Sequence, residues 1–243
     1  HENVPDEWID RVFAVAGDTD QHVHMILTKR SARMRSYLAA RRDAKPFMVP
    51  LGNGLIAQHP FNNELLPPRN VWLGVSVEDQ SRADERIPDL LATPAAVRFL
   101  SCEPLLADLD LEDVRFRGGA RDYYGVNALT GSGHRADEDG NTDADPCEYP
   151  ALDWVIAGGE SGPGARPMHP DWVRSLRDQC ADAGVPFHFK QWGEWLPIAD
   201  RDKHGFNGWK VIDHLEQRNG MFRVGKRVTG RLLDGVTHDG MPA

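Results

Sequence analysis

The chain has 243 residues, of which 40% are hydrophobic and 27% charged, and its formal net charge is −9 at pH 7. These values are typical of a soluble globular domain, and the acidic balance argues against a protein that coats nucleic acid or lies on an anionic membrane. No apolar stretch approaches the roughly 20 residues that span a bilayer. The three scattered cysteines form neither a disulfide framework nor a metal-binding motif, which indicates a cytoplasmic protein.

Helical patterns alternate with short β-rich runs along the chain. The helical patterns cover residues 5–16, 31–42, 80–92 and 170–183. We expect Pro88 to break the third helix into two pieces. The β-rich runs cover residues 22–27, 71–75, 97–100, 154–157 and 185–189. This alternation predicts an α/β fold with parallel strands, in a single barrel-like domain over residues 1–243.

Three segments do not follow this pattern. Residues 43–69 are rich in proline, asparagine and glycine, which predicts a long connection between elements. Residues 115–150 contain glycine clusters and an acidic string, and such a composition cannot bury much apolar surface. We therefore expect a flexible insertion there, either a lid over a site or a variable surface loop. Residues 197–243 are expected to form an irregular carboxyl-terminal extension.

Each β-rich run ends in a cluster of polar residues. Ligands of parallel α/β folds bind at the carboxyl ends of the strands, so these clusters predict one site. The most distinctive cluster contains Gly158, Gly159, Glu160 and Ser161. Its glycines would let a ligand approach the backbone, and Glu160 would hold an amine or a hydroxyl group. The alternative interpretation is a tight turn with a solvated carboxylate.

The third and fifth runs lead into further reactive groups. Cys102 is expected to be a buried structural thiol rather than a nucleophile, whereas Glu103 is a candidate for chemistry. Lys190, Gln191 and Trp192 combine a cation, an amide and an indole. The indole suits stacking on a flat ring, or else it closes the end of the barrel.

The first and second runs also end in polar groups. Ser76 and Glu78 are candidates for binding a ribose or a metal, whereas Asp79 is expected to cap the next helix. Thr28, Lys29 and Arg30 are candidates for binding a carboxylate or a phosphate, or else they are solvated at a helix start. The chain has no spacing of histidines and cysteines that predicts a metal site.

Several of these motifs resemble, in the same order, those of one bacteriophage-associated family. The motifs are Leu27-Thr28-Lys29-Arg30, Trp72-Leu73-Gly74-Val75-Ser76-Val77-Glu78, Ser101-Cys102-Glu103-Pro104-Leu105-Leu106, Gly158-Gly159-Glu160-Ser161-Gly162-Pro163 and Phe189-Lys190-Gln191-Trp192-Gly193-Glu194-Trp195. The family is named for phage gene products thirty-seven and sixty-eight and is also described as a domain of unknown function. The resemblance covers nearly the whole chain outside residues 115–150.

This resemblance implies a partial (β/α) barrel of the radical S-adenosylmethionine type. Members of the family carry an amino-terminal three-cysteine motif, whose thiolates would hold a [4Fe–4S] cluster that binds S-adenosylmethionine. Cys102, Cys147 and Cys180 do not have that spacing. We therefore expect a fragment of a longer protein or a natural derivative without a cluster.

The first functional hypothesis is a radical S-adenosylmethionine-like enzyme of unknown substrate. Under this hypothesis the side chains divide into cofactor-binding Ser76, Glu78, Gly158, Gly159, Glu160 and Ser161, catalytic Glu103 and Lys190, and substrate-binding Thr28, Lys29, Arg30, Gln191 and Trp192. The alternative is a non-catalytic binding module that engages a protein encoded nearby or a nucleic acid in phage–host interaction. Neither hypothesis involves a membrane.

Overall fold

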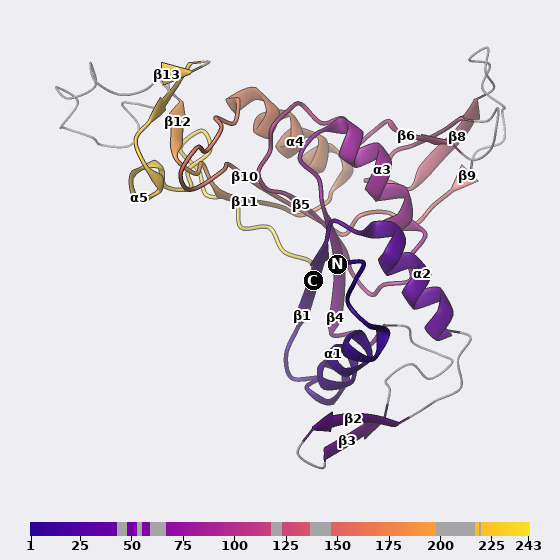
Figure 1. The fold of residues 1–243 in the computed structure, drawn as a ribbon. Helices are drawn as coiled ribbons and strands as arrows, with labels where there is room; N and C mark the ends of the chain where they lie inside the picture. Colours follow the sequence, from indigo (N-terminus) through magenta and orange to yellow (C-terminus); the bar gives the residue numbers. More distant parts are fainter. Residues whose placement is uncertain are drawn as a thin grey trace.

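The centre of the molecule is an open, five-stranded, all-parallel sheet (Figure 1). The computed structural model describes residues 1–42, 48–52, 55–58, 67–117, 123–136, 147–197, 217–218 and 220–243. The strands, in their order across the sheet, are β1 (His24–Thr28), β4 (Val71–Ser76), β5 (Arg98–Cys102), β10 (Trp154–Gly158) and β11 (Phe187–Gln191). The predicted parallel α/β fold is confirmed, and no pairing within the described part of the chain closes the sheet into a barrel.

Four helices pack on this sheet through one core. They are α1 (Asp6–Asp18), α2 (Ser31–Arg42), α3 (Gln80–Leu91) and α4 (Pro170–Ala183). Leu38 of α2, Ile87 of α3 and Leu176 of α4 join buried strand residues in that core. Burial of each such side chain contributes about 1.5–3 kcal/mol. None of the described helices is long and apolar enough to cross a membrane.

Local sequence explains most of the helix ends. The Asp79 carboxylate accepts a hydrogen bond from the Arg82 backbone N at 3.0 Å and caps α3, as predicted. Gly184 has a left-handed φ of 70° directly after α4. The predicted break at Pro88 is wrong, because α3 continues through it to Leu91. Tertiary packing of the last turn of α3, where Leu90 and Leu91 are buried, outweighs the local cost of the proline.

The described part of residues 115–150 contains regular structure. It belongs to an antiparallel sheet of β6 (Val114–Arg117), β7 (Tyr123–Val126), β8 (Ser132–Ala136) and β9 (Cys147–Glu148), in that order. Figure 1 shows this sheet beside α3, at the opposite end of the molecule from α5. Val126, Ala128 and Leu129 are buried in the main core, so the expectation of little apolar burial is wrong for these residues. The acidic string at 137–140 lies outside the described residues.

Two smaller elements occupy other segments that the sequence left irregular. The hairpin of β2 (Met48–Gly52) and β3 (Leu55–Gln58) lies within the connection 43–69 and packs on α1 through Val49. In the carboxyl-terminal extension, β12 (Trp195–Pro197), β14 (Met221–Arg223) and β13 (Gln217–Arg218) form an antiparallel sheet, and α5 (Lys226–Thr229) follows.

The last residues of the chain cover the outer edge of β11. Phe189 N donates to His238 O at 3.0 Å, and Gly240 N donates to Phe187 O at 3.0 Å. The tail therefore continues the hydrogen bonding of the sheet beyond its fifth strand, in an antiparallel sense. An edge strand that is paired in this way is protected from pairing with other chains.

Asp234 fastens the start of this tail to α4. Arg174 Nη2 donates to Asp234 Oδ1 at 2.7 Å and Arg177 Nη1 to Oδ2 at 2.7 Å. Hydrogen bonds from Arg174, and then from Arg177, outweigh partial burial and lower the pKa of Asp234 to about 2. The ionised carboxylate is therefore more favoured in the folded chain than in the unfolded one.

We expect Asp234→Asn to destabilise the protein at neutral pH by about 1 kcal/mol, a value reduced for solvent screening. The lowered pKa places this stabilisation above the unfolded-state pKa of about 3.9, and the stabilisation is lost as the pH falls toward 2. Urea denaturation of both proteins from neutral to acidic pH measures the difference. A difference that did not shrink in acid would show that the ion pair is not its source.

Candidate functional site

Three acid–base pairs lie at the carboxyl ends of the parallel strands. The pairs are Glu103–Lys190, Glu78–Lys29 and Glu160–Arg166. In each pair the carboxylate is the more buried partner, with side-chain exposures of 18%, 12% and 26% against 56%, 52% and 57% for the cations. This edge of the sheet therefore presents carboxylates beneath exposed cations.

Backbone hydrogen bonds join the loops that carry these pairs. Leu105 N donates to Gly158 O at 3.0 Å, and Leu106 N donates to Glu78 O at 2.9 Å. The loop after β5 is thereby fixed to the ends of both β10 and β4. The charge of Glu78 also contributes, after that of Glu160, to a raised pKa of Arg166. The polar residues that the sequence placed at separate strand ends thus share one edge of the sheet.

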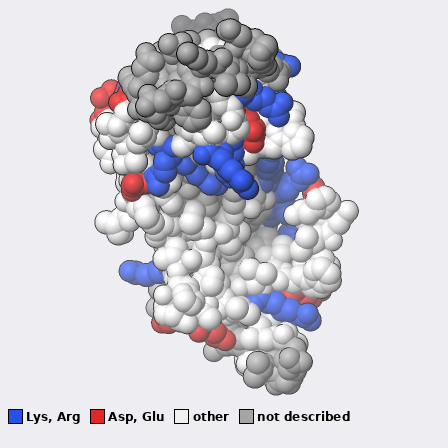
Figure 2. All heavy atoms as spheres, turned by 90° about the vertical axis from the view of Figure 1, so that its left-hand side faces the viewer, with Lys and Arg blue, Asp and Glu red and all other residues white. Residues whose placement is uncertain are grey.

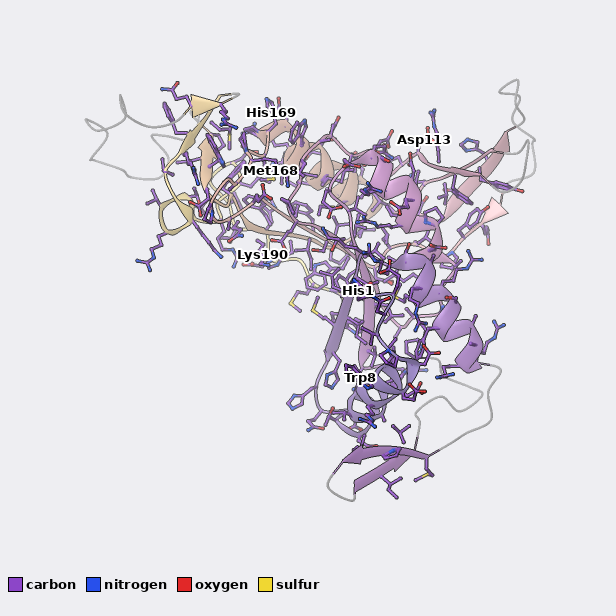
Figure 3. All side chains as sticks on the ribbon, in the orientation of Figure 1. His1, Trp8, Asp113, Met168, His169 and Lys190 are labelled. Carbon is purple, nitrogen blue, oxygen red and sulfur yellow. The ribbon has the colours of Figure 1, made fainter. Side chains whose placement is uncertain are left out.

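Glu103 and Lys190 meet across β10, which lies between their two strands. Lys190 Nζ lies 3.0 Å from Glu103 Oε2. Gly158 is the residue of β10 beneath this contact, and a Cβ there would lie 2.6 Å from Glu103 Oε1. Figure 3 shows Lys190 on the opposite side of the sheet from His169, which caps the start of α4. The pair therefore lies on the face that the helices leave uncovered.

Glu78 has a second cationic partner that the sequence did not indicate as functional. Arg86 of α3 donates to Glu78 Oε2 at 3.0 Å and to Ser76 O at 2.8 Å. Burial opposes ionisation of Glu78, but Lys29 and Arg86 together outweigh it and hold the pKa of this carboxyl below its usual value. The sequence did contain one sign of this role. Arg86 lies among the apolar residues of the buried face of α3, between Ala83 and Ile87, where an arginine needs an acidic partner.

Thr28 and Arg30 are engaged away from this centre. The Thr28 hydroxyl accepts a hydrogen bond from Arg30 N at 2.9 Å. The Arg30 guanidinium lies 2.5 Å from Glu2. Of the three residues at the end of β1, Lys29 is thus the one that reaches the acidic groups of the next strand.

Glu160 is neutralised by Arg166, another residue that sequence analysis did not single out. Arg166 Nη2 donates to Glu160 Oε1, while its Nε and its backbone N donate to Oε2, all at 2.8 Å. These hydrogen bonds hold the pKa of Glu160 below its usual value. A ligand amine at Glu160 would therefore have to compete with a two-pronged arginine contact.

The glycines beside Glu160 make room for protein atoms. A Cβ at Gly159 would lie 1.9 Å from Trp192 O, and one at Gly193 would lie 2.1 Å from Glu160 O. Gly159 N donates to Gln191 O at 2.9 Å, and Glu194 N donates to Glu160 O at 2.9 Å. The two most distinctive motifs of the sequence thus cross each other backbone to backbone. This crossing explains Gly159 without a ligand.

The remaining predicted residues lie around this crossing. Gln191 Nε2 donates to Ser161 Oγ at 3.1 Å, which joins the two loops again. Trp192 is only 1% exposed, and its indole N donates to Leu232 O at 2.8 Å. The indole therefore belongs to the protein core at the end of the sheet and offers no face to a ligand from solvent.

Cys102 is fully buried in the core, where burial raises the pKa of its thiol well above the usual value. Cys180 is also buried and free. Within the described residues, no group of three or more histidine, cysteine and acidic side chains is placed to hold a metal ion.

An aromatic cluster lies below Glu103 and Lys190, on the face of the sheet that carries no helices. Phe99, Trp154 and Ile156 are buried there, and Trp72 packs against them. The Trp154 indole N donates to Gly240 O of the tail at 2.7 Å. Successive side chains of β10 point to opposite faces of the sheet. Trp154 and Ile156 therefore belong to this cluster, whereas Val155 and Ala157 belong to the core beneath the helices.

Comparison with protein-family models matches residues 1–242 to the family described as "Protein of unknown function (DUF5131)". No curated protein and no solved structure gives a match. The family match extends over the parallel sheet and the three smaller sheets of the described residues. The chain therefore belongs to the DUF5131 family of proteins of unknown function.

Proposed function

We propose that the carboxyl edge of the parallel sheet binds a small molecule with an α-amino acid head group, and that this molecule is S-adenosylmethionine. The observation that carries the proposal is the set of partly buried carboxylates, each beneath an exposed cation. An amino acid head group has one ammonium and one carboxylate. It can exchange with such a pair without leaving a charge unpaired.

Glu103 and Lys190 are the pair best suited to this exchange. The ligand ammonium replaces Lys190 Nζ on the Glu103 carboxylate, and the displaced lysine turns to the ligand carboxylate. The lysine is more than half exposed, so its movement costs little, whereas the more buried Glu103 stays in place. Glu78 and Lys29 offer the same chemistry one strand beyond β5, for a ribose hydroxyl or a second charged group.

The resemblance to phage proteins of the radical S-adenosylmethionine type motivates this choice of ligand. The described residues do not fit a [4Fe–4S] cluster, which requires several cysteine thiolates at one place. Cys102 and Cys180 are buried with protonation favoured, and the described side chains form no cluster of ligands. We therefore assign ligand binding to this chain and no redox step. Its buried free thiols suit the reducing cytoplasm that we propose as its location.

The test is calorimetric titration of the chain with S-adenosylmethionine. We expect Glu103→Gln to weaken binding roughly ten- to a hundredfold, because a charge-assisted hydrogen bond of about 1.5–3 kcal/mol is lost. The glutamine keeps the size of the side chain, so the free energy of unfolding should change little.

Glu85→Gln is the matched control. Glu85 is exposed on α3, pairs with Arg82 three residues earlier, and lies 3.9 Å from Arg86, which Glu78 holds at 3.0 Å. This variant makes the same chemical change and should bind with wild-type affinity. The proposal fails if the wild-type chain shows no binding, or if Glu103→Gln and Glu85→Gln have equal affinities.

A further inference from the structure

The carboxyl-terminal part of this acidic chain carries an excess of cations. Residues 217–243 contain five basic side chains, Arg218, Arg223, Lys226, Arg227 and Arg231, against the two carboxylates Asp234 and Asp239. Both carboxylates are engaged by arginines. Asp234 is held by Arg174 and Arg177 of α4, and Asp239 contacts Arg231. Residues 217–243 are therefore a region in which basic side chains outnumber acidic ones, in a chain whose total charge is −9.

Lys226 and Arg227 are the most available of these cations. Both are exposed on α5, and no carboxylate in the described part of the chain lies within ion-pair distance of either. The Thr229 hydroxyl donates to Gly193 O at 2.7 Å, so α5 is fixed to the crossing loops. Figure 2 shows Lys and Arg side chains gathered on the side of the molecule where Figure 1 places α5.

The positive region continues toward the strand ends. Arg223 Nη2 donates to Gly162 O at 3.4 Å, in the loop that also carries Arg166. Burial lowers the pKa of His188, and the charges of Arg231 and Lys190 lower it further against the opposing charge of Glu103. We call Arg223, Lys226 and Arg227 the basic face; Arg166, Lys190 and Arg231 border it but are paired with Glu160, Glu103 and Asp239.

We propose that the basic face binds the phosphate backbone of a nucleic acid. These cations lie on both β14 and α5, which favours a polyanion with several phosphates over a single phosphate group. Most of them are arginines, whose planar fork matches phosphate oxygens. The acidic remainder of the chain repels a polyanion, so contact is confined to this face.

The composition of the surface distinguishes this partner from a membrane. A helix that lies on a membrane combines cations with large apolar side chains that enter the lipid. The exposed large apolar residues of the described chain lie on α1, β1, the β2–β3 hairpin and the tail, and α5 carries none of them.

Fluorescence anisotropy with a short fluorescein-labelled single-stranded DNA tests the proposal. The logarithm of the binding constant should fall linearly with the logarithm of the salt concentration. The double variant Lys226→Ala/Arg227→Ala should reduce the slope by about 1.4, at about 0.7 per lost phosphate contact. At low salt we expect its affinity to fall about tenfold or more.

The control removes the same charge from another surface. Arg35→Ala/Arg82→Ala changes two exposed arginines of α2 and α3, which pair with Asp89 and Glu85. This variant should keep the wild-type salt slope. Absence of DNA binding by the wild-type chain, or equal losses in both double variants, would overturn the proposal. Tighter binding to phosphatidylserine vesicles than to DNA would overturn it in favour of a membrane.

This proposal is independent of the amino acid site. Lys226 and Arg227 lie outside the Glu103–Lys190 pair, so their replacement should leave the calorimetric titration with S-adenosylmethionine unchanged. Loss of DNA binding with retained S-adenosylmethionine binding supports both proposals, and each of the two assays can fail without the other.

Discussion

Gly193→Ala is expected to lower the free energy of unfolding by about 3–5 kcal/mol. Gly193 has a φ of +80°, which L side chains rarely adopt, and its Cβ would lie 2.1 Å from the backbone O of Glu160. A backbone atom cannot swing aside as a flexible side chain does. The two loops must therefore separate, and the hydrogen bond from Glu194 N to Glu160 O should be lost with them. Urea denaturation measures the change.

Gly164→Ala is the matched control for this prediction. Gly164 has a similar φ of +76°, but nothing lies within 4 Å of its Cβ position. Its replacement should cost only the local strain of a left-handed alanine, about 1–2 kcal/mol. The difference between the two variants isolates the crossing of the loops. Equal losses of stability would mean that the loops yield easily and that the crossing does not hold the site together.

This crossing limits what the glycine motif can indicate about function. Glycines at a strand end allow either a ligand or another piece of backbone to approach closely. The sequence cannot separate these cases, because the approaching Trp192 carbonyl belongs to a loop more than thirty residues away from Gly159. In this chain the protein itself occupies the space beside Gly159. Glu103 and Lys190, rather than the glycines, are therefore the residues on which the proposed ligand binding rests.

The parallel sheet was predictable because its signals are local. Each of its strands is a short β-rich run, and the turns after these runs carry polar residues. Asp79 and Gly184 follow similarly local rules for helix ends. Because the strands are parallel, the polar clusters at their carboxyl ends all lie at one edge of the sheet. The partners of the carboxylates were not predictable, since Arg86 and Arg166 reach them only through the folded arrangement of α3 and of the loop after β10.

The second sheet was missed because its glycines have a role that depends on distant residues. Glycine is usually unfavourable in a strand interior, and Gly133 therefore suggested a loop. In the structure, Gly133 lies in β8, where a Cβ would be 2.6 Å from the ring of Tyr149. The aromatic ring covers the glycine and supplies the packing that the missing side chain cannot. Such a pairing becomes visible only when both segments are in place.

Trp154→Ala is expected to lower the free energy of unfolding by about 3–5 kcal/mol. Trp154 is only 5% exposed, and its ring packs edge-on against Trp72 at 6.0 Å between centroids and tilted against Phe99 at 6.2 Å. Its indole N also holds Gly240 of the tail. Replacement by alanine therefore opens a cavity between the sheet and the tail, and it removes the hydrogen bond that holds the tail there.

Trp154→Phe separates these two contributions. Phenylalanine keeps an aromatic ring in the cluster but cannot donate to Gly240 O, so we expect a smaller loss, of which the hydrogen bond accounts for about 1 kcal/mol. Limited proteolysis should cleave the tail faster in both variants, whereas urea denaturation should show the large loss only for Trp154→Ala. Trp154 lies on the same face of the sheet as Lys190 and His188. The ring centroids of Trp154 and His188 are 6.0 Å apart. Equal stabilities of Trp154→Ala and Trp154→Phe would show that packing of the aromatic cluster contributes little to stability. The cluster would then not hold the Glu103–Lys190 pair in place, and the proposed ligand site would lack its structural support.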